Sequence, residues 1–69
     1  MVMGMDEVLP IGTKVPGYGK VGSVGWVGER YYWLIDKRGG IAMIPSDALL
    51  EHIRLNIEQF EKMNGWRLL

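Results

Sequence analysis

Residues 30–36 read RYYWLID, and no other stretch of this 69-residue sequence is as rich in aromatic and branched apolar side chains. Such residues favour a β-strand. Successive side chains of a strand point to opposite faces. One face therefore carries Tyr31, Trp33 and Ile35, and the other carries Tyr32 and Leu34. Because both faces are apolar, we expect this strand to lie at the centre of the fold and to be buried on both sides.

Shorter strand-like segments flank this central strand. Residues 11–15 and 20–27 precede it, and residues 41–44 follow it. Glycine and proline between these segments are typical of turns, and KRGG at residues 37–40 is typical of a hairpin. The glycines within residues 20–27 indicate a strongly bent strand, as the corners of a barrel require. We therefore expect residues 11–45 to form an SH3-like small barrel of four to five short strands.

Residues 46–63 have the pattern of one amphipathic helix. Ser46 is a typical N-cap, and Asn64-Gly65 is a typical C-cap signal. Apolar residues recur at spacings of four, four and three, which is one helical stripe. Residues 64–69 then form an apolar tail. The whole chain, residues 1–69, is expected to be one mainly β domain with a C-terminal helix, and residues 1–8 are expected to be disordered.

The chain is too short to bury a large core by itself. A domain of this size buries only about 60% of the surface that its unfolded chain exposes. The sequence has no cysteine and a single histidine, which excludes disulfides, thiolate metal sites and multi-histidine metal sites within one chain. Self-association is the remaining source of extra stability. We expect a homo-oligomer whose interface comprises Leu49, Ile53, Ile57, Phe60 and Trp66.

Charge and hydropathy exclude some partners. Eight basic residues balance eight acidic residues, so the net charge gives no general attraction to nucleic acid. Lys37 and Arg38, together with Lys20 and Arg30, would form only a small basic patch. No apolar run is long enough to span a membrane. The N-terminus lacks the basic and apolar regions of a signal peptide, and we expect a cytoplasmic protein without a membrane partner.

The aromatic residues are the main candidates for a binding surface. Small barrels use exposed aromatic rings to bind proline-rich peptides, nucleobases or other flat ligands. The same rings could instead fill the core, and both interpretations stay open at this point. The candidate ligand-binding or partner-binding residues are Trp26, Arg30, Tyr31, Tyr32, Trp33, Ala42 and Ile44.

Three short motifs give the sequence a family resemblance. They are Gly12-Thr13-Lys14-Val15, Val24-Gly25-Trp26, and Ile41-Ala42-Met43-Ile44-Pro45 followed by Ala48-Leu49. Together they span residues 11–49 and resemble the plasmid-borne type II dihydrofolate reductases. The resemblance implies an SH3-like barrel, assembly as a tetramer around a central pore, and NADPH as cofactor. In that family a glutamine and a tyrosine hold cofactor and folate, and the matching positions here are Ala42 and Ile44.

Neither Ala42 nor Ile44 can donate or accept a side-chain hydrogen bond. A pore for hydride transfer needs polar groups that orient the nicotinamide and the pterin. We therefore predict a non-enzymatic binding module for a protein or a small molecule, with no cofactor and no catalytic or metal-binding residues. The alternatives are an NADPH-dependent reductase and a KOW-like nucleic-acid-binding module, the latter suggested by residues 19–24. Small cysteine-free barrels are common in phages and mobile elements, which is the expected origin.

Overall fold

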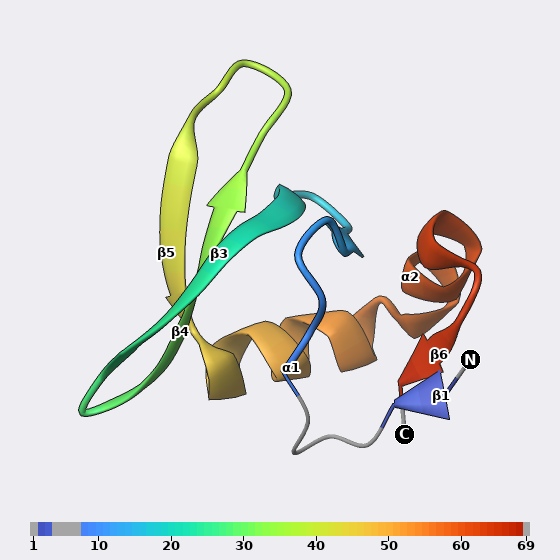
Figure 1. The fold of residues 1–69 in the computed structure, drawn as a ribbon. Helices are drawn as coiled ribbons and strands as arrows, with labels where there is room; N and C mark the ends of the chain where they lie inside the picture. The colour runs from blue at the N-terminus through green and yellow to red at the C-terminus, as the bar shows by residue number, and fades with distance from the viewer. Residues whose placement is uncertain (1, 4–7, 69) are drawn as a thin grey trace.

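The structure is a computed structural model of the chain, and it describes residues 2–3 and 8–68 (Figure 1). Residues 1 and 4–7 lie outside the described part, and with them most of the segment that the sequence predicts to be disordered. Within that segment, Val2–Met3 forms the short strand β1, which pairs in parallel with β6 (Arg67–Leu68). The two ends of the described chain therefore lie side by side.

Four antiparallel strands form a curled half-barrel sheet in the order β2-β3-β4-β5. Their bounds are Lys14–Val15 for β2, Gly19–Val27 for β3, Glu29–Ile35 for β4 and Ile41–Pro45 for β5. The predicted central strand, now β4, pairs with both β3 and β5. The prediction of a mixed β and α domain is confirmed, and the sheet has four strands, where four to five were predicted.

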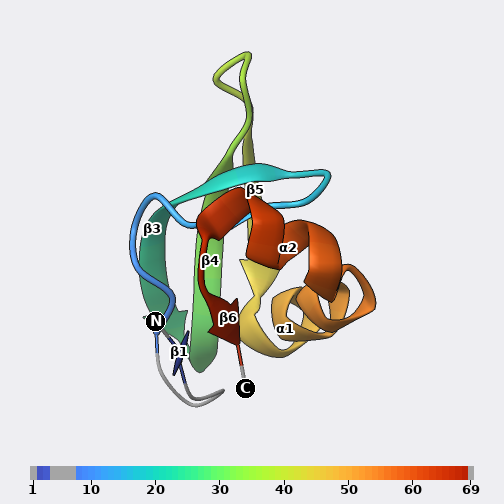
Figure 2. The same cartoon turned by 90° about the vertical axis from the view of Figure 1, so that its right-hand side faces the viewer.

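Both helices cover the same side of this sheet (Figure 2). On that inner face, Tyr32 and Leu34 of β4 are almost completely buried. The buried apolar core comprises Leu9, Val15, Val21, Tyr32, Leu34, Leu49, Ile53 and Phe60. The opposite face of β4 has no helix over it, and its side chains are only half-buried. The prediction that β4 is buried on both sides is therefore wrong, because both helices of the described residues lie over one face.

The C-terminal region contains two helices, α1 (Ser46–Leu55) and α2 (Ile57–Asn64), rather than the single helix predicted over residues 46–63. The break lies at Asn56, whose backbone leaves the helical region at φ −127° and ψ 34°. Its side-chain nitrogen donates to the carbonyl oxygen of His52 at 2.9 Å, and such local bonds compete with a continuous helix. Phe60 of α2 lies in the same core as Leu49 and Ile53 of α1.

The helix ends agree only partly with their predicted caps. Ser46 is the first helical residue rather than the cap, and Pro45 occupies the cap position without a side-chain hydrogen bond. At the other end, Gly65 adopts the left-handed conformation at φ 75°, and its N–H donates to the carbonyl oxygen of Glu61 at 2.8 Å. The predicted C-cap is therefore confirmed.

The helical stripe predicted as a subunit interface packs inside the chain itself. Leu49, Ile53 and Phe60 are 0% exposed and form part of the core. Ile57 and Trp66 are partly buried against the same core, and the ring of Trp66 meets that of Phe60 edge-on at 5.2 Å. The predicted interface is wrong for the three fully buried residues, because their side chains have no surface left for a second subunit.

Candidate binding surface

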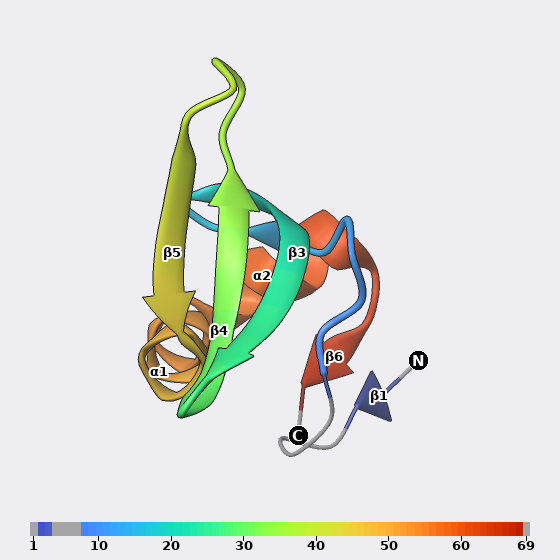
Figure 3. The same cartoon turned by 60° about the vertical axis from the view of Figure 1, so that its left-hand side comes forward.

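The side of the sheet that no helix covers, called the outer face below, is the first candidate surface (Figure 3). The register places Trp33 directly opposite Met43 and Ile35 directly opposite Ile41. Directly paired residues of antiparallel strands share a face, so these side chains are neighbours on one surface. Met43 is 54% exposed and Ile41 is 68% exposed. The outer face therefore presents a continuous row of apolar side chains to solvent, with Tyr31 at one end.

Two glycines of β3, Gly22 and Gly25, allow side chains of β4 to pack directly against the backbone of β3 on this face. A Cβ atom on Gly25 would collide with the six-membered ring of Trp33, and one on Gly22 would collide with the end of Ile35. The missing side chains of β3 thus provide the space in which these groups rest. As a result, the ring of Trp33 and the end of Ile35 lie against the backbone of β3.

The edge of the sheet at β2 is closed. The side-chain oxygen of Asn64 accepts from the N–H of Lys14 at 2.7 Å, and its nitrogen donates to the Lys14 carbonyl oxygen at 2.8 Å. The amide of Asn64 therefore satisfies the backbone of β2 as a further strand would. Beyond β2, the backbone of Val21 is bonded to Gly12 and Thr13, and a bulge between Val21 and Ser23 follows. Bulges make strand edges poor templates for pairing.

The edge at β5 is open, and its geometry follows from the hairpin before it. Gly39, at φ +81°, is the last residue of the turn, and its N–H donates to the carbonyl oxygen of Asp36. The N–H of Asp36 in turn donates to the Gly40 carbonyl oxygen at 3.0 Å, which makes Asp36 and Gly40 a hydrogen-bonded pair. Hydrogen-bonded pairs alternate along antiparallel strands. Ala42 and Ile44 therefore bond to β4, whereas the backbone groups of Ile41 and Met43 point away from the sheet.

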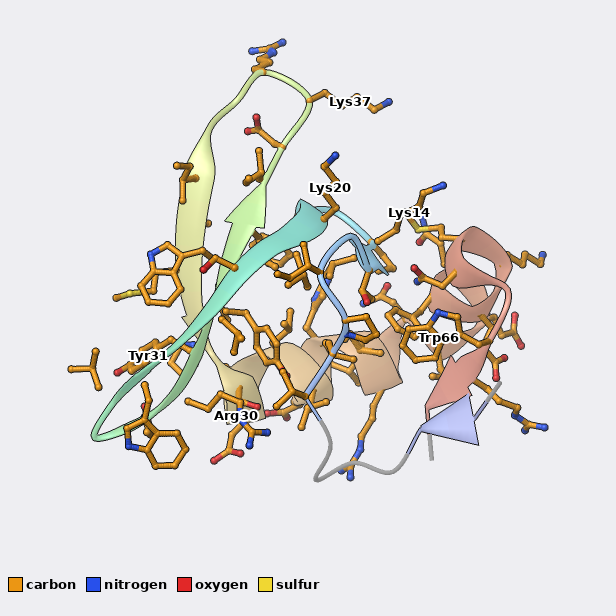
Figure 4. The ribbon with its side chains drawn as sticks, viewed as in Figure 1. Lys14, Lys20, Arg30, Tyr31, Lys37 and Trp66 are labelled. Atoms are coloured by element: carbon orange, nitrogen blue, oxygen red, sulfur yellow. The ribbon has the colours of Figure 1, made fainter. Side chains whose placement is uncertain are left out.

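A third feature is basic and lies at the end of the sheet near the β4–β5 loop. Lys14, Lys20 and Lys37 line one depression of about 520 Å³, and Arg38 lines a neighbouring depression of about 460 Å³. The three lysines project at the same end of the molecule, whereas Arg30 lies at the other end of the sheet (Figure 4). The basic patch suggested by the sequence is therefore divided, and Lys14 joins the larger part.

The candidate residues from the sequence do not form one surface. Tyr31 and Trp33 lie on the outer face, but Tyr32 is 1% exposed, and its hydroxyl accepts from the buried N–H of Leu9 at 3.0 Å. Tyr32 is thus a core residue and not a ligand-binding one. Ala42 and Ile44 are on the inner face, and Ile44 packs against the core.

Trp26 and Arg30 remain as a separate pair at the tip of the sheet. They lie directly opposite each other on β3 and β4, and Trp26 is 69% exposed. They share the face of Tyr32 rather than that of Trp33, since two positions along a strand return to the same face. These residues are therefore on the other side of the sheet from Trp33.

Sequence reasoning missed Met43 and Ile41, which together with Ile35 complete the outer face. The signal that could have found them is the hairpin at residues 37–39. A three-residue loop that ends in a left-handed glycine fixes the pairing of the strands on either side. That pairing places Met43 opposite Trp33.

Two polar side chains near these surfaces have structural partners. The carboxylate of Glu29 raises the pKa of Tyr31 above its ordinary value, through a hydrogen bond and through its charge. His52 Nε2 lies 2.6 Å from the carbonyl oxygen of Pro16, and its ring meets Tyr18 edge-on at 5.0 Å. A carbonyl oxygen can only accept, so Nε2 donates, and His52 holds the β2–β3 turn against α1.

Within the described residues, no group of three or more potential metal ligands occurs, and no helix has the length and hydropathy needed to cross a membrane. No protein-family model matches the sequence, and neither a curated protein nor a solved structure shows significant similarity to it. The outer face, the β5 edge and the basic depression are therefore the features from which a function can be inferred.

Proposed function

We propose that this protein is a non-enzymatic interaction module of the SH3-like small-barrel kind, and that it self-associates by pairing β5 with β5 of a second copy. The observation that carries the proposal is the open edge of β5 beside two largely exposed apolar side chains, Ile41 and Met43. Such an edge is a ready template for another strand.

The composition of β5 supports pairing rather than protection. Natural edge strands avoid pairing by means of charged residues, bulges or covering segments. β5 reads IAMIP and contains no charged residue, and its register with β4 is regular. Its one protective feature is Pro45 at the end of the strand. By contrast, the β2 edge is closed by Asn64. Of these two edge strands, β5 is thus the one available to a partner.

A second copy fits this edge by symmetry. Antiparallel pairing about a two-fold axis at Met43 would join the N–H and carbonyl of each Met43 to those of the other copy. Beyond Met43 the pairing ends at Pro45, which has no N–H and, as the N-cap of α1, uses its carbonyl oxygen for the first bond of that helix. Each backbone bond contributes about 0.5–1.5 kcal/mol net. Partial burial of Ile41 and Met43 adds to this.

The test compares three chains by sedimentation velocity at micromolar concentration. The native chain and Met43→Leu should sediment as dimers of twice 7.8 kDa. Met43→Pro should sediment as a monomer, because proline removes the outward N–H but leaves the bonds of Ala42 and Ile44 to β4 intact. Circular dichroism checks that each chain is folded.

If Met43→Pro does not fold, Met43→Lys replaces it in the test. This variant keeps the backbone N–H of residue 43 but places two lysine charges, one from each copy, beside the two-fold axis of the dimer. A native chain that is monomeric throughout, or a folded variant of either kind that remains dimeric, would refute the proposed pairing.

The absence of reductase activity is a separate prediction, which an absorbance assay with NADPH and dihydrofolate decides. Turnover above the blank without enzyme would contradict it.

A further inference from the structure

The charges of this neutral chain are unevenly distributed. Residues 46–64, which form the two helices, carry four carboxylates and two basic side chains other than histidine. At the end of the sheet near the β4–β5 loop, three lysines line one depression, and Figure 4 shows them together. Local potential, rather than net charge, determines which ligands a surface attracts. This end of the molecule therefore has to be considered separately from the neutral total.

The strand register brings two of these lysines into direct opposition. Lys14 of β2 pairs with Lys20 of β3. Like charges at directly opposed positions destabilise a sheet. Within the described part of the chain, the ammonium groups of Lys20 and Lys37 have no carboxylate partner. The depression thus carries three ammonium groups and one carboxylate, and a bound anion would relieve the repulsion that remains.

One carboxylate, that of Asp36, lines the same depression as the three lysines. Oδ1 of Asp36 accepts from the backbone N–H of Arg38 and from that of Gly40, both at 2.8 Å. These bonds hold the carboxylate against the loop backbone. Asp36 therefore shapes the β4–β5 hairpin, while the lysines remain available to a ligand.

The basic depression continues into the outer face. Its lining includes the apolar side chains of Ile35 and Met63. Ile35 lies directly opposite Lys20 on the neighbouring strand. Trp33 lies two residues from Ile35 along β4, so their Cα atoms are about 7 Å apart. A ligand that bridges these features needs negative charges at one end and a flat apolar group at the other.

We infer that this surface binds single-stranded nucleic acid, with phosphates at Lys14, Lys20 and Lys37 and a base on Trp33. Proteins that bind single strands combine a positively charged groove with aromatic rings on which bases stack. A duplex keeps its bases stacked inside and offers no free base to Trp33. The inference is independent of the proposed dimer, because none of these four residues lies on β5.

The experiment measures fluorescence anisotropy of a short labelled oligothymidylate with the native protein at several salt concentrations. Affinity should fall as salt rises, with a slope of about −0.7 in log–log form for each phosphate contact. Lys20→Gln should bind more weakly and reduce that slope by about 0.7. Trp33→Leu should weaken binding at least about fivefold without changing the slope. Trp33→Phe retains a ring and should recover most of the loss.

Arg67→Gln is the matched control for lost charge, since Arg67 lies on β6 and pairs with Glu61 at 3.4 Å. It should bind like the native chain. Lys20→Gln removes the repulsion with Lys14, so it should fold at least as stably as the native protein, which keeps a loss of binding interpretable. Binding no tighter than that of inorganic pyrophosphate or of the matching duplex would overturn the inference. Equal effects of Lys20→Gln and Arg67→Gln would also overturn it.

Discussion

At the scale of single residues, Tyr31 and Tyr32 show how neighbouring side chains of one type take different roles. Tyr32 points into the core, where its hydroxyl is the acceptor for the buried N–H of Leu9. Tyr31 points to the outer face, and its hydroxyl interacts with Glu29 at the surface. The first hydroxyl therefore anchors the chain before β2, whereas the second affects only local charge.

Tyr32→Phe should destabilise the protein by roughly 1–3 kcal/mol, because it leaves the buried N–H of Leu9 without an acceptor. Denaturant unfolding measures the loss. Tyr31→Phe is the control, and it should unfold at nearly the same denaturant concentration as the native chain, as most surface variants do. If both variants unfold at the same denaturant concentration, the hydroxyl of Tyr32 does not hold Leu9.

Glu29→Gln should lower the pKa of Tyr31 towards the ordinary value of 10.0, because the negative charge that opposes ionisation is removed. A raised pKa means that the folded state holds the proton more tightly than the unfolded chain does. This contribution to stability is therefore present below pH 10 and is lost as the pH rises further. Titration of the Tyr31 ring by NMR tests the shift, and an unchanged pKa would refute the role of Glu29.

At the scale of elements, the β2–β3 turn depends on a close approach to β4. Gly19 has a φ of +110°, and a Cβ atom there would collide with the backbone oxygen of Ile35. Gly17, in the same turn, also has a positive φ of +82° but open space around it. Backbone atoms cannot move aside as a flexible side chain can, so the two glycines differ in what they tolerate.

Gly17→Ala should cost roughly 1–2 kcal/mol, which is the strain of a left-handed residue with a Cβ atom. Gly19→Ala should cost clearly more, because the collision with β4 adds to that strain. Thermal unfolding of the two variants provides the comparison. Equal melting temperatures would mean that the turn does not approach β4 as closely as described.

The elements also show what a sequence pattern can and cannot predict. Local composition predicted the positions of the strands and the helix C-cap at Gly65, because turn and strand preferences depend on only a few neighbouring residues. The apolar stripe of residues 49–60 was recognised, but its partner was not. Periodicity indicates that a face is buried and does not say against what. The break at Asn56 depends on a side-chain bond to His52, and the spacing of apolar residues gives no sign of it.

At the scale of the whole molecule, the number of helices determines how much of the sheet is buried. Two helices cover the inner face, and no helix or strand of the described residues covers the outer one (Figure 3). Tyr31 and Trp33 were proposed from the sequence as binding residues, and they do lie on the uncovered face. Ala42 and Ile44 were chosen from a family resemblance, and the strand register turns both inward.

If β5 pairs with β5 of a second copy, the amide hydrogen of Met43 becomes hydrogen-bonded. In a lone chain this N–H points away from the sheet, whereas the N–H groups of Ala42 and Ile44 are bonded to β4. Amide hydrogen exchange, followed by NMR at several protein concentrations, therefore tests the central claim most directly. Pairing predicts that Met43 is protected at high concentration and loses its protection on dilution, while Ala42 and Ile44 stay protected. Exchange of Met43 at the unprotected rate at every concentration would contradict the claim.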